Sequence, residues 1–252
     1  MSSHQQWRVE TVEETGSTNA DVAARFHAGE EAGLVLVAEH QTAGRGRLGR
    51  SWESPPGASL VLSALLAPDA APERWPWLPL TTGMAVAKTL GRVAGVTADL
   101  KWPNDVLIEG LKVCGILVER VEVSTGSTDG RRAAAVVGIG INVSQTREEL
   151  PVPGATSLAL ASGSPADRDE LLTALLLELQ QDLEVWESGG EVRQRYLSQC
   201  VTIGQQVNVA VPGGEVRGEA VDIDEGGRLV VHTADGEQHL GAGDVVHVRR
   251  QE

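Results

Sequence analysis

Apolar and polar residues alternate along most of the chain in patterns that predict both strands and helices. Short apolar runs are typical of buried strands, and apolar residues at three- and four-residue spacing are typical of helices. We expect strands at Val9–Glu14, Leu34–Glu39, Ala58–Leu66, Leu100–Trp102, Asp105–Ile108, Val113–Val123 and Ala134–Val143. We expect helices from Ser17 or Thr18 to about His27, from Trp77 to Val93, from Asp167 to Trp186 and from Glu191 to Ser198. The two strands expected at Val113–Val123 and Ala134–Val143 flank a polar turn at residues 124–130. This arrangement predicts an antiparallel hairpin.

After Cys200 the pattern changes to short strands of alternating polarity, separated by glycine-rich turns. The expected strands are Gln206–Val211, Glu215–Asp222, Leu229–His232, Gln238–Leu240 and Val245–Val248. Several short strands within about fifty residues predict a small barrel. We therefore expect a domain boundary near residues 198–202, with a larger domain at 1–199 and the barrel at 200–252.

Composition narrows the classes of protein to which the chain can belong. Apolar residues make up 41% of the chain, which supports a buried core. The formal net charge of -14 disfavours nucleic-acid binding, which depends on Lys and Arg meeting phosphates, and gives no attraction to anionic membranes. The N-terminus is polar, no run approaches the ~20 apolar residues of a membrane span, and the two cysteines lack metal-ligand spacing. We expect a cytoplasmic protein with no membrane, nucleic-acid or zinc partner.

The loop that starts at Gln41 concentrates positive charge against this acidic background. Residues 44–50 read Gly-Arg-Gly-Arg-Leu-Gly-Arg, and no acidic residue occurs between Gln41 and Trp52. Arginine offers a planar fork of donors to phosphate or carboxylate, and glycine lets the backbone N–H groups approach an anion closely. The order of residues differs from that of a P-loop. A solvated surface loop is the alternative, and the position after a buried strand favours an anion-binding loop.

Two further segments place polar residues next to expected strands. Asn104 and Asp105 follow Pro103 and can either coordinate Mg²⁺ and a nucleotide or form a simple Asx turn. Lys112 opens an apolar strand, and it is either a surface lysine or a fixed charge that neutralises a carboxylate attacking phosphorus. Gly115 in the middle of that strand indicates close approach by a ligand or by backbone.

The segment Gly138–Val143 carries a polar residue at the end of an apolar run. Asn142 either caps the strand end or binds a nucleotide. The glycine pattern lacks the third Gly or Ala of the dinucleotide fingerprint, which disfavours a nicotinamide-dependent enzyme.

Together these segments resemble the biotin protein ligase (biotin–[acetyl-CoA-carboxylase] ligase) family. The matching pieces are Thr15–Asn19, Gln41–Arg47 with Ser51-Trp52, Lys101–Asp105, Lys112–Glu119 and Gly138–Val143. They occur in the family's order and spacing, and Thr156-Ser157-Leu158 with the small barrel extends the resemblance to nearly the whole chain. The resemblance implies an α+β fold, in which a mixed β-sheet flanked by helices, like that of class II synthetases, precedes a C-terminal SH3-like β-barrel.

The resemblance also implies a two-step reaction that uses ATP and Mg²⁺. Biotin carboxylate attacks the α-phosphate of ATP to give biotinyl-5′-AMP, and a lysine of the biotin carboxyl carrier protein then attacks this anhydride and releases AMP. The implied biotin-binding residues are Ser17, Thr18, Asn19, Gln41, Gly44, Arg45, Gly46, Arg47, Lys112 and Gly115. The implied ATP-binding residues are Arg47, Trp52, Asn104, Asp105, Lys112 and Asn142, with Asp105 as the metal ligand and Lys112, Arg45 and Arg47 as catalytic residues.

Three alternatives compete with this hypothesis. A lipoate-protein ligase shares the fold and the adenylation chemistry, but the Gly-Arg-Gly-Arg loop and Lys-Trp-Pro-Asn-Asp favour biotin. A non-catalytic biotin or nucleotide sensor would keep the pocket without the lysine-modifying step, and an RNA-binding module is disfavoured by the net charge. Too few residues precede Thr15 for a winged helix-turn-helix, so we expect a ligase without a DNA-binding domain. We expect a monomer or a weak homodimer.

Overall fold

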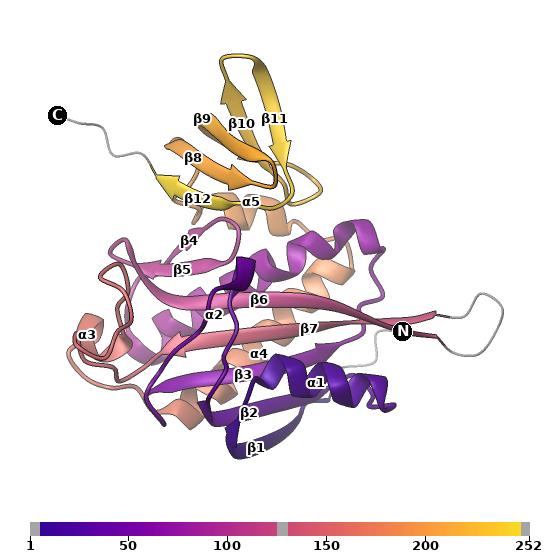
Figure 1. Ribbon diagram of the computed structural model, residues 1–252, viewed down its shortest axis with the longest axis vertical. Coiled ribbons are helices and arrows are strands. Elements are labelled where there is room, and N and C mark those ends of the chain that lie inside the picture. The colour runs from indigo at the N-terminus through magenta and orange to yellow at the C-terminus, as the bar shows by residue number, and fades with distance from the viewer. Residues whose placement is uncertain (1–5, 125–130, 248–252) are drawn as a thin grey trace.

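The computed structural model describes residues 6–124 and 131–247, and it consists of two β-sheets with helices around the larger one (Figure 1). The larger sheet has the order β1-β2-β3-β7-β6-β5-β4. Its strands are β1 (Arg8–Thr15), β2 (Leu34–Gln41), β3 (Ser59–Leu66), β4 (Asp99–Lys101), β5 (Asp105–Ile108), β6 (Leu111–Ser124) and β7 (Arg131–Asn142). The helices are α1 (Thr18–His27), α2 (Leu78–Ala94), α3 (Leu158–Ser162), α4 (Arg168–Glu187) and α5 (Val192–Leu197). Of the turn expected at 124–130, Ser124 belongs to β6, and residues 125–130 lie outside the described residues.

The larger sheet is mixed, as the resemblance implied. β1 and β2 run parallel because α1 returns the chain across the sheet between them, whereas the other neighbouring strands are antiparallel. β6 and β7 form the expected antiparallel hairpin, in register from Cys114 opposite Ile141 to Ser124 opposite Arg131. This hairpin occupies the centre of the sheet together with β3.

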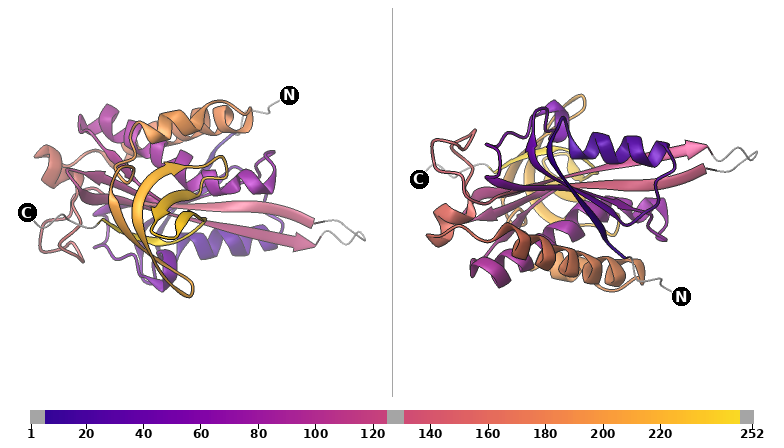
Figure 2. Two further views of the ribbon diagram at one scale, coloured as in Figure 1. Left: turned by 90° about the horizontal axis from the view of Figure 1, so that it is seen from above. Right: turned by 90° about the horizontal axis from the view of Figure 1, so that it is seen from below.

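Helices cover the two faces of the larger sheet unequally. α1 lies on one face, and α2 and α4 lie on the other (Figure 2). Successive residues of a strand point to opposite faces, so Leu34 and Leu36 of β2 pack with Phe26 of α1, whereas Val35 and Val37 belong to the core beneath α2 and α4. The continuous apolar run of β2 reflects burial on both of its faces.

The helices fall close to their expected positions, with two differences. α2 begins at Leu78 because residues 72–77, which contain Pro72 and Pro76, form a separate tight helical turn. α3 was not expected, because five residues are too few to show a helical period. Ser17 stands at the expected N-cap of α1, but its side chain makes no capping hydrogen bond. Gly29 follows the helix end with a φ of 105°, a left-handed conformation that favours glycine.

The C-terminal sheet contains the expected five strands. They are β8 (Gln206–Val211), β9 (Gly214–Ile223), β10 (Leu229–Thr233), β11 (Gly236–Leu240) and β12 (Asp244–His247), in the order β11-β10-β9-β8-β12. All pairings are antiparallel, and none joins β11 to β12 among the described residues, so the barrel is open along that seam. Val248, the expected last residue of β12, is not described.

Two tryptophans that lie outside the C-terminal sheet, Trp77 and Trp102, form hydrogen bonds with the turn between β9 and β10. The Trp77 indole donates to the Glu225 carbonyl at 2.8 Å, and the Trp102 indole donates to the Gly227 carbonyl at 3.1 Å. The backbone N–H of Trp102 also donates to Thr202 Oγ1 at 3.1 Å. Because Trp102 is only 1% exposed and belongs to one apolar cluster with residues of both sheets, these contacts hold the two sheets in a fixed relation.

We expect Trp102→Phe to lower the free energy of unfolding by about 1–3 kcal/mol, because the buried Gly227 carbonyl loses its donor. Trp75→Phe is the matched control, since the Trp75 indole donates locally to the Ala70 carbonyl and lies closer to solvent. The control should change stability by less than about 0.5 kcal/mol. Urea denaturation followed by circular dichroism measures both values, and equal losses would show that the inter-sheet bond is not the stabilising contact.

Candidate functional site

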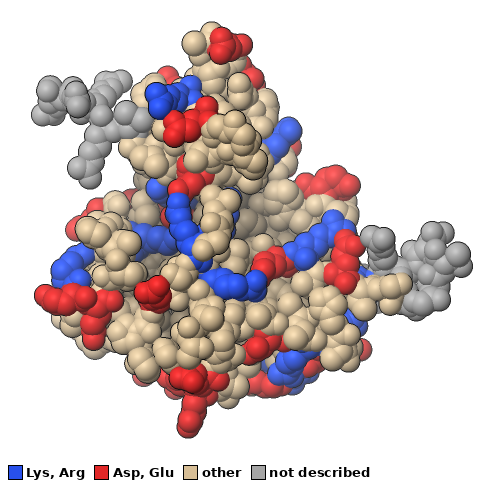
Figure 3. Space-filling view, in the orientation of Figure 1, with Lys and Arg blue, Asp and Glu red and all other residues tan. Residues whose placement is uncertain are grey.

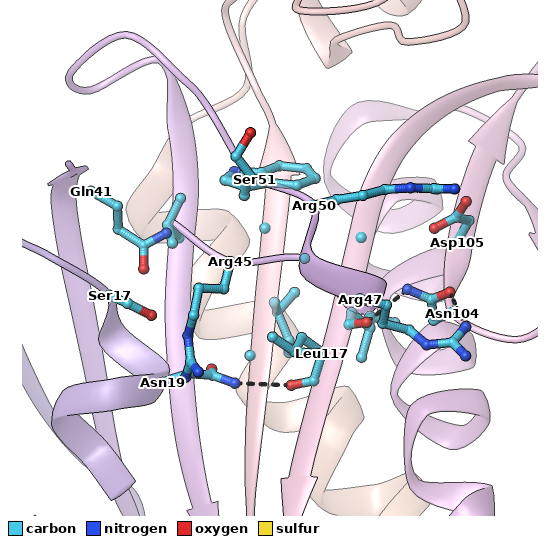
Figure 4. Close-up of a pocket in the computed structure, with 18 of the residues that line it drawn as sticks. Ser17, Asn19, Gln41, Arg45, Arg47, Arg50, Ser51, Asn104, Asp105 and Leu117 are labelled. Atoms are coloured by element: carbon cyan, nitrogen blue, oxygen red, sulfur yellow. Dashed lines mark hydrogen bonds between the residues drawn. The ribbon is translucent and has the colours of Figure 1, made fainter. Parts of the chain in front are cut away.

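A pocket opens on the face of the larger sheet that carries α1. The helix covers the part of this face formed by Leu65, Ala134 and Val136. Two residues further along the same strands, Ser63 and Gly138 point to the same face and lie against Thr18 and Asn19 in the first turn of α1, and the helix does not cover the face beyond this turn. The uncovered part of the face is the floor of the pocket, and the loop after β2 passes over it (Figure 4).

Glycines in the central strands give the pocket its floor. A Cβ atom built on Gly138 would lie 2.2 Å from Asn19 Oδ1, and a Cβ on Gly140 would lie 2.6 Å from the Trp52 ring. A Cβ on Gly115 would lie 3.0 Å from the same ring. The Trp52 indole and the Asn19 amide therefore rest against bare backbone, a close approach that only glycine permits. Gly115 was expected to allow close approach by a ligand or by backbone, and the atoms nearest to its Cβ position are instead those of the Trp52 and Lys112 side chains.

Hydroxyl and amide groups from the start of α1 and the end of β2 gather at one end of the pocket. Gln41 Oε1 accepts from the Thr18 backbone N–H at 2.8 Å and lies 3.1 Å from Thr18 Oγ1. Asn19 Nδ2 donates to the Leu117 carbonyl at 3.2 Å, and Ser63 Oγ donates to Asn19 Oδ1 at 2.6 Å. Ser17, Thr18 and Asn19 are all buried, and the hydrogen bonds of Thr18 and Asn19 fix the donors and acceptors of these two side chains at this end.

The arginines of the loop at 44–50 reach three different parts of the molecule. Arg45 forms an ion pair with Glu119 of β6 at 2.7 Å, and Arg47 donates to Asn104 Oδ1 at 3.0 Å. Arg50 pairs with Asp244 of the C-terminal sheet. Burial lowers the pKa of the Arg47 guanidinium from its usual value, although the charges of Asp105 and Asp244 oppose this shift. Figure 3 shows basic side chains gathered in the hollow between the two sheets.

Lys112 lies beside this cluster of arginines. Its Nζ is 2.6 Å from Asp105 Oδ1 and 6.0 Å from the centre of the Trp52 ring. The contact between Lys112 and Asp105 is an ion pair that lacks hydrogen-bond geometry. Asp105 Oδ1 is buried and makes no hydrogen bond among the described residues. The backbone of Lys112 is held from both sides, since its N–H donates to the Gly154 carbonyl and its carbonyl accepts from the Thr156 N–H, each at 2.8 Å.

The structure brings together most of the residues that the sequence indicated. The pocket is lined by Ser17, Thr18, Asn19, Gln41, Arg45, Gly46, Arg47, Trp52, Asn104, Asp105, Lys112 and Gly115. Gly44 and Asn142 are outside this lining. A Cβ on Gly44 would lie 2.4 Å from the Trp52 carbonyl oxygen, so Gly44 lets the two sides of the loop pack together. Asn142 is buried, donates to the Thr156 carbonyl at 2.9 Å and accepts from Gln145 at 3.1 Å.

Several pocket residues were not recognised from the sequence. Gly138 and Gly140 were weighed as a dinucleotide fingerprint and stood in a matching segment, but they were given no role of their own, although glycines at alternate positions of a strand are the same signal that Gly115 gave. Glu119, which contacts the pocket residues Asn19 and Arg45 but is outside the pocket lining, stood inside a matching segment without a role. Asp244 comes from the C-terminal sheet, and no local pattern connects it with a loop 194 residues earlier.

The part of the chain that the structure describes contains neither a cluster of metal ligands nor a membrane-spanning helix. Within residues 6–124 and 131–247, no three His, Cys, Asp or Glu side chains are placed to hold a metal ion. Over the same residues, no helix combines the length and the apolar character needed to cross a bilayer.

Comparisons with known proteins agree on one family. Residues 12–142 match the biotin/lipoate A/B protein ligase family, and residues 202–248 match the biotin protein ligase C-terminal domain. The chain is 40% identical over 251 residues to the biotin–[acetyl-CoA-carboxylase] ligase of Mycobacterium tuberculosis, covering 96% of this chain and 90% of that protein. It is 33% identical to the enzyme of the same name from Paracoccus denitrificans, covering 92% and 97% of the two chains.

A solved structure agrees with this result. The biotin protein ligase from Aquifex aeolicus in complex with biotin and ATP superimposes with a TM-score of 0.80 at 31% identity, and the match covers 96% of this chain and 99% of that one. The expected α+β fold with an SH3-like C-terminal part is thereby confirmed. From its sequence and its fold, this chain belongs to the biotin protein ligase family.

Proposed function

We propose that this chain is an ATP-dependent ligase that attaches biotin to a lysine of a biotin carboxyl carrier protein. The observation that carries this proposal is the composition of the pocket. Hydroxyl and amide groups around Asn19, with Arg45 beside them, form one end of the pocket, and Arg47 and Lys112 line another part of it, where they contact Asn104 and Asp105. Such a pocket can hold a neutral polar ring at one end and two anions, a carboxylate and a triphosphate, at the other.

The polar end fits the ureido ring of biotin. Ser17 and Thr18 supply hydroxyl groups, and Asn19 Oδ1 keeps a lone pair beyond the one that Ser63 uses. Gln41 fixes the start of α1 through the Thr18 backbone N–H. The glycine floor at Gly115, Gly138 and Gly140 leaves room for the ligand against the strand backbones.

The cationic end fits the adenylation step. The biotin carboxylate oxygen attacks the α-phosphorus, and pyrophosphate leaves with the electron pair of the broken P–O bond. Lys112 and Arg47 lie where they can bind the oxygens on which negative charge accumulates. Trp52 supplies a flat apolar surface beside Lys112 for the nucleotide. Gly44, Gly46 and the rest of the loop are proposed to exclude water from the mixed anhydride.

The residues present also fit a nucleotide-bound Mg²⁺. Asp105 Oδ1 is buried, makes no hydrogen bond among the described residues and pairs with the Lys112 ammonium at 2.6 Å, and Asn104 is its neighbour in the pocket. One carboxylate together with substrate phosphates is a usual binding mode for Mg²⁺. When bound, the ion would neutralise phosphate charge, and Asp105 would hold it. Asn142, at the end of β7, is proposed to bind the nucleotide. In this structure its amide is hydrogen-bonded to Thr156 and Gln145.

In the second step the carrier lysine attacks the biotinyl carbonyl, an amide bond forms and AMP leaves. We infer that this occurs in the cytoplasm, with the chain as a monomer or weak homodimer. We also propose residues 1–199 as the catalytic domain and residues 200–252 as the C-terminal domain.

The test of the proposed function is a modification assay. The chain is incubated with ATP, Mg²⁺, biotin and a carrier domain, and mass spectrometry should show one biotinyl group on the carrier lysine. A carrier with arginine in place of that lysine is the control and should stay unmodified. Modification with lipoate in place of biotin would support a lipoate ligase, and tight biotin binding without modification would support a sensor.

Arg47→Gly should leave the fold intact but accelerate escape of biotinyl-5′-AMP by about 10²–10³-fold, because the guanidinium that holds the adenylate is lost. Adenylate dissociation is measured by rapid filtration after a single turnover, and thermal unfolding confirms the fold. An unchanged dissociation rate would contradict the proposed role of the loop.

Gly138→Ala should weaken biotin binding by about tenfold or more, since the new methyl group must displace the Asn19 amide. Gly91→Ala in α2 is the matched control, because its Cβ would find the Val96 carbonyl oxygen at an ordinary 3.5 Å. Isothermal titration with biotin compares both variants with the unmodified chain, and equal affinities would show that Asn19 does not contact biotin.

A further inference from the structure

Glu119 links the polar end of the pocket to the arginine loop. Its Oε2 atom accepts from Asn19 Nδ2 at 2.8 Å and from Arg45 Nη2 at 2.7 Å. Asn19 belongs to α1 and Arg45 belongs to the loop after β2, while Glu119 stands on the central strand β6. One carboxylate oxygen on a rigid strand therefore holds groups from two separate segments.

The contact with Glu119 fixes the orientation of the Asn19 amide. Glu119 Oε2 and the Leu117 carbonyl accept hydrogen bonds only, so the side of the amide that faces them must be the NH2 group. Figure 4 shows the bond from Asn19 to Leu117. The amide oxygen then faces Ser63, whose hydroxyl donates to it at 2.6 Å. Both Nδ2 protons are thereby used within the protein, and the group that Asn19 can still offer to a ligand is a lone pair of its oxygen.

The same carboxylate supplies the anion that Arg45 binds. The Arg45 and Glu119 side chains are 44% and 32% exposed, so the pair is partly screened by water, but the bond is short and charge-assisted. Backbone hydrogen bonds close the loop on itself, and Arg47 and Arg50 tie it to Asn104 and Asp244, so the contact of Arg45 with Glu119 is the tie that joins the loop to β6 beside Asn19.

We propose that Glu119 is a positioning residue that couples the loop to the biotin end of the pocket. It holds Arg45 over the pocket and keeps the oxygen of Asn19 as the acceptor for a ligand N–H. The inference rests on the proposed function, because the ligand at this end is taken to be biotin. Its loop contact can be tested without any ligand.

The substitution Glu119→Gln removes the negative charge of the side chain and keeps its size. Glutamine keeps the size of the side chain and one acceptor oxygen, but it carries no charge for Arg45, and its own NH2 group permits the Asn19 amide to turn over. Glu122→Gln is the matched control, since Glu122 stands on the same strand and pairs with Arg120 at 2.5 Å.

The first experiment is limited proteolysis of the ligand-free chain with trypsin, read by mass spectrometry. Cleavage after Arg45, Arg47 and Arg50 should be about tenfold faster in Glu119→Gln than in the unmodified chain or in Glu122→Gln, because the loop opens more often. A variant that fails to fold would instead be cut at arginines throughout the chain. Equal loop cleavage in all three folded chains would overturn the proposed tie between Glu119 and the loop.

The second experiment is a titration with biotin, combined with steady-state kinetics on a carrier domain. Glu119→Gln should raise the Kd and the KM for biotin by about tenfold while the KM for ATP changes by less than about twofold. Equal rises for biotin and ATP, or an unchanged Kd for biotin, would overturn the positioning role. If the unmodified chain binds no biotin and modifies no carrier, the proposed function fails, and the trypsin comparison still decides whether Glu119 holds the loop.

Discussion

The pairing of β6 with β7 at the centre of the larger sheet is the constraint on which the rest of the site depends. The register sets Gly115 opposite Gly140 and Leu117 opposite Gly138. Because side chains alternate between the faces, all three glycines lie on the face that carries α1, at the first turn of that helix and beyond it. A shift of one residue would place bulky isoleucines there and would turn Glu119 away from the loop. The pocket exists because two strands present bare backbone at the same place.

Charge is the second organising element of the molecule. A chain with a net charge of -14 gathers Arg45, Arg47, Arg50 and Lys112 around one pocket. Each cation is matched by a carboxylate or an amide oxygen: Glu119, Asn104, Asp244 and Asp105. These contacts compensate the repulsion between neighbouring cations. An incoming carboxylate or phosphate can take over the same donors, so the cluster is stable in the absence of ligand and still competent to bind one.

The C-terminal sheet takes part in the site through one edge. Gly243 and Asp244 line the pocket, and Asp244 pairs with Arg50 of the loop. This contact requires the two sheets to keep a fixed separation, which the indoles of Trp77 and Trp102 provide through their bonds to the turn between β9 and β10. Contacts far from the pocket therefore help to decide which residues line it.

The sequence by itself determined the elements and much of the chemistry of the site, because periodicity, turn residues and the Gly-Arg-Gly-Arg segment are local properties of the chain. It could also have indicated Gly138 and Gly140 through the reasoning that identified Gly115. It could not assign Arg45 to Glu119 or Arg50 to Asp244, since those partners depend on strand order and on how the sheets dock. It likewise could not place Gly44 and Asn142 outside the pocket lining. Only the tertiary structure decided these partners, because residues distant in sequence meet only once the sheet register and the docking of the two sheets are fixed.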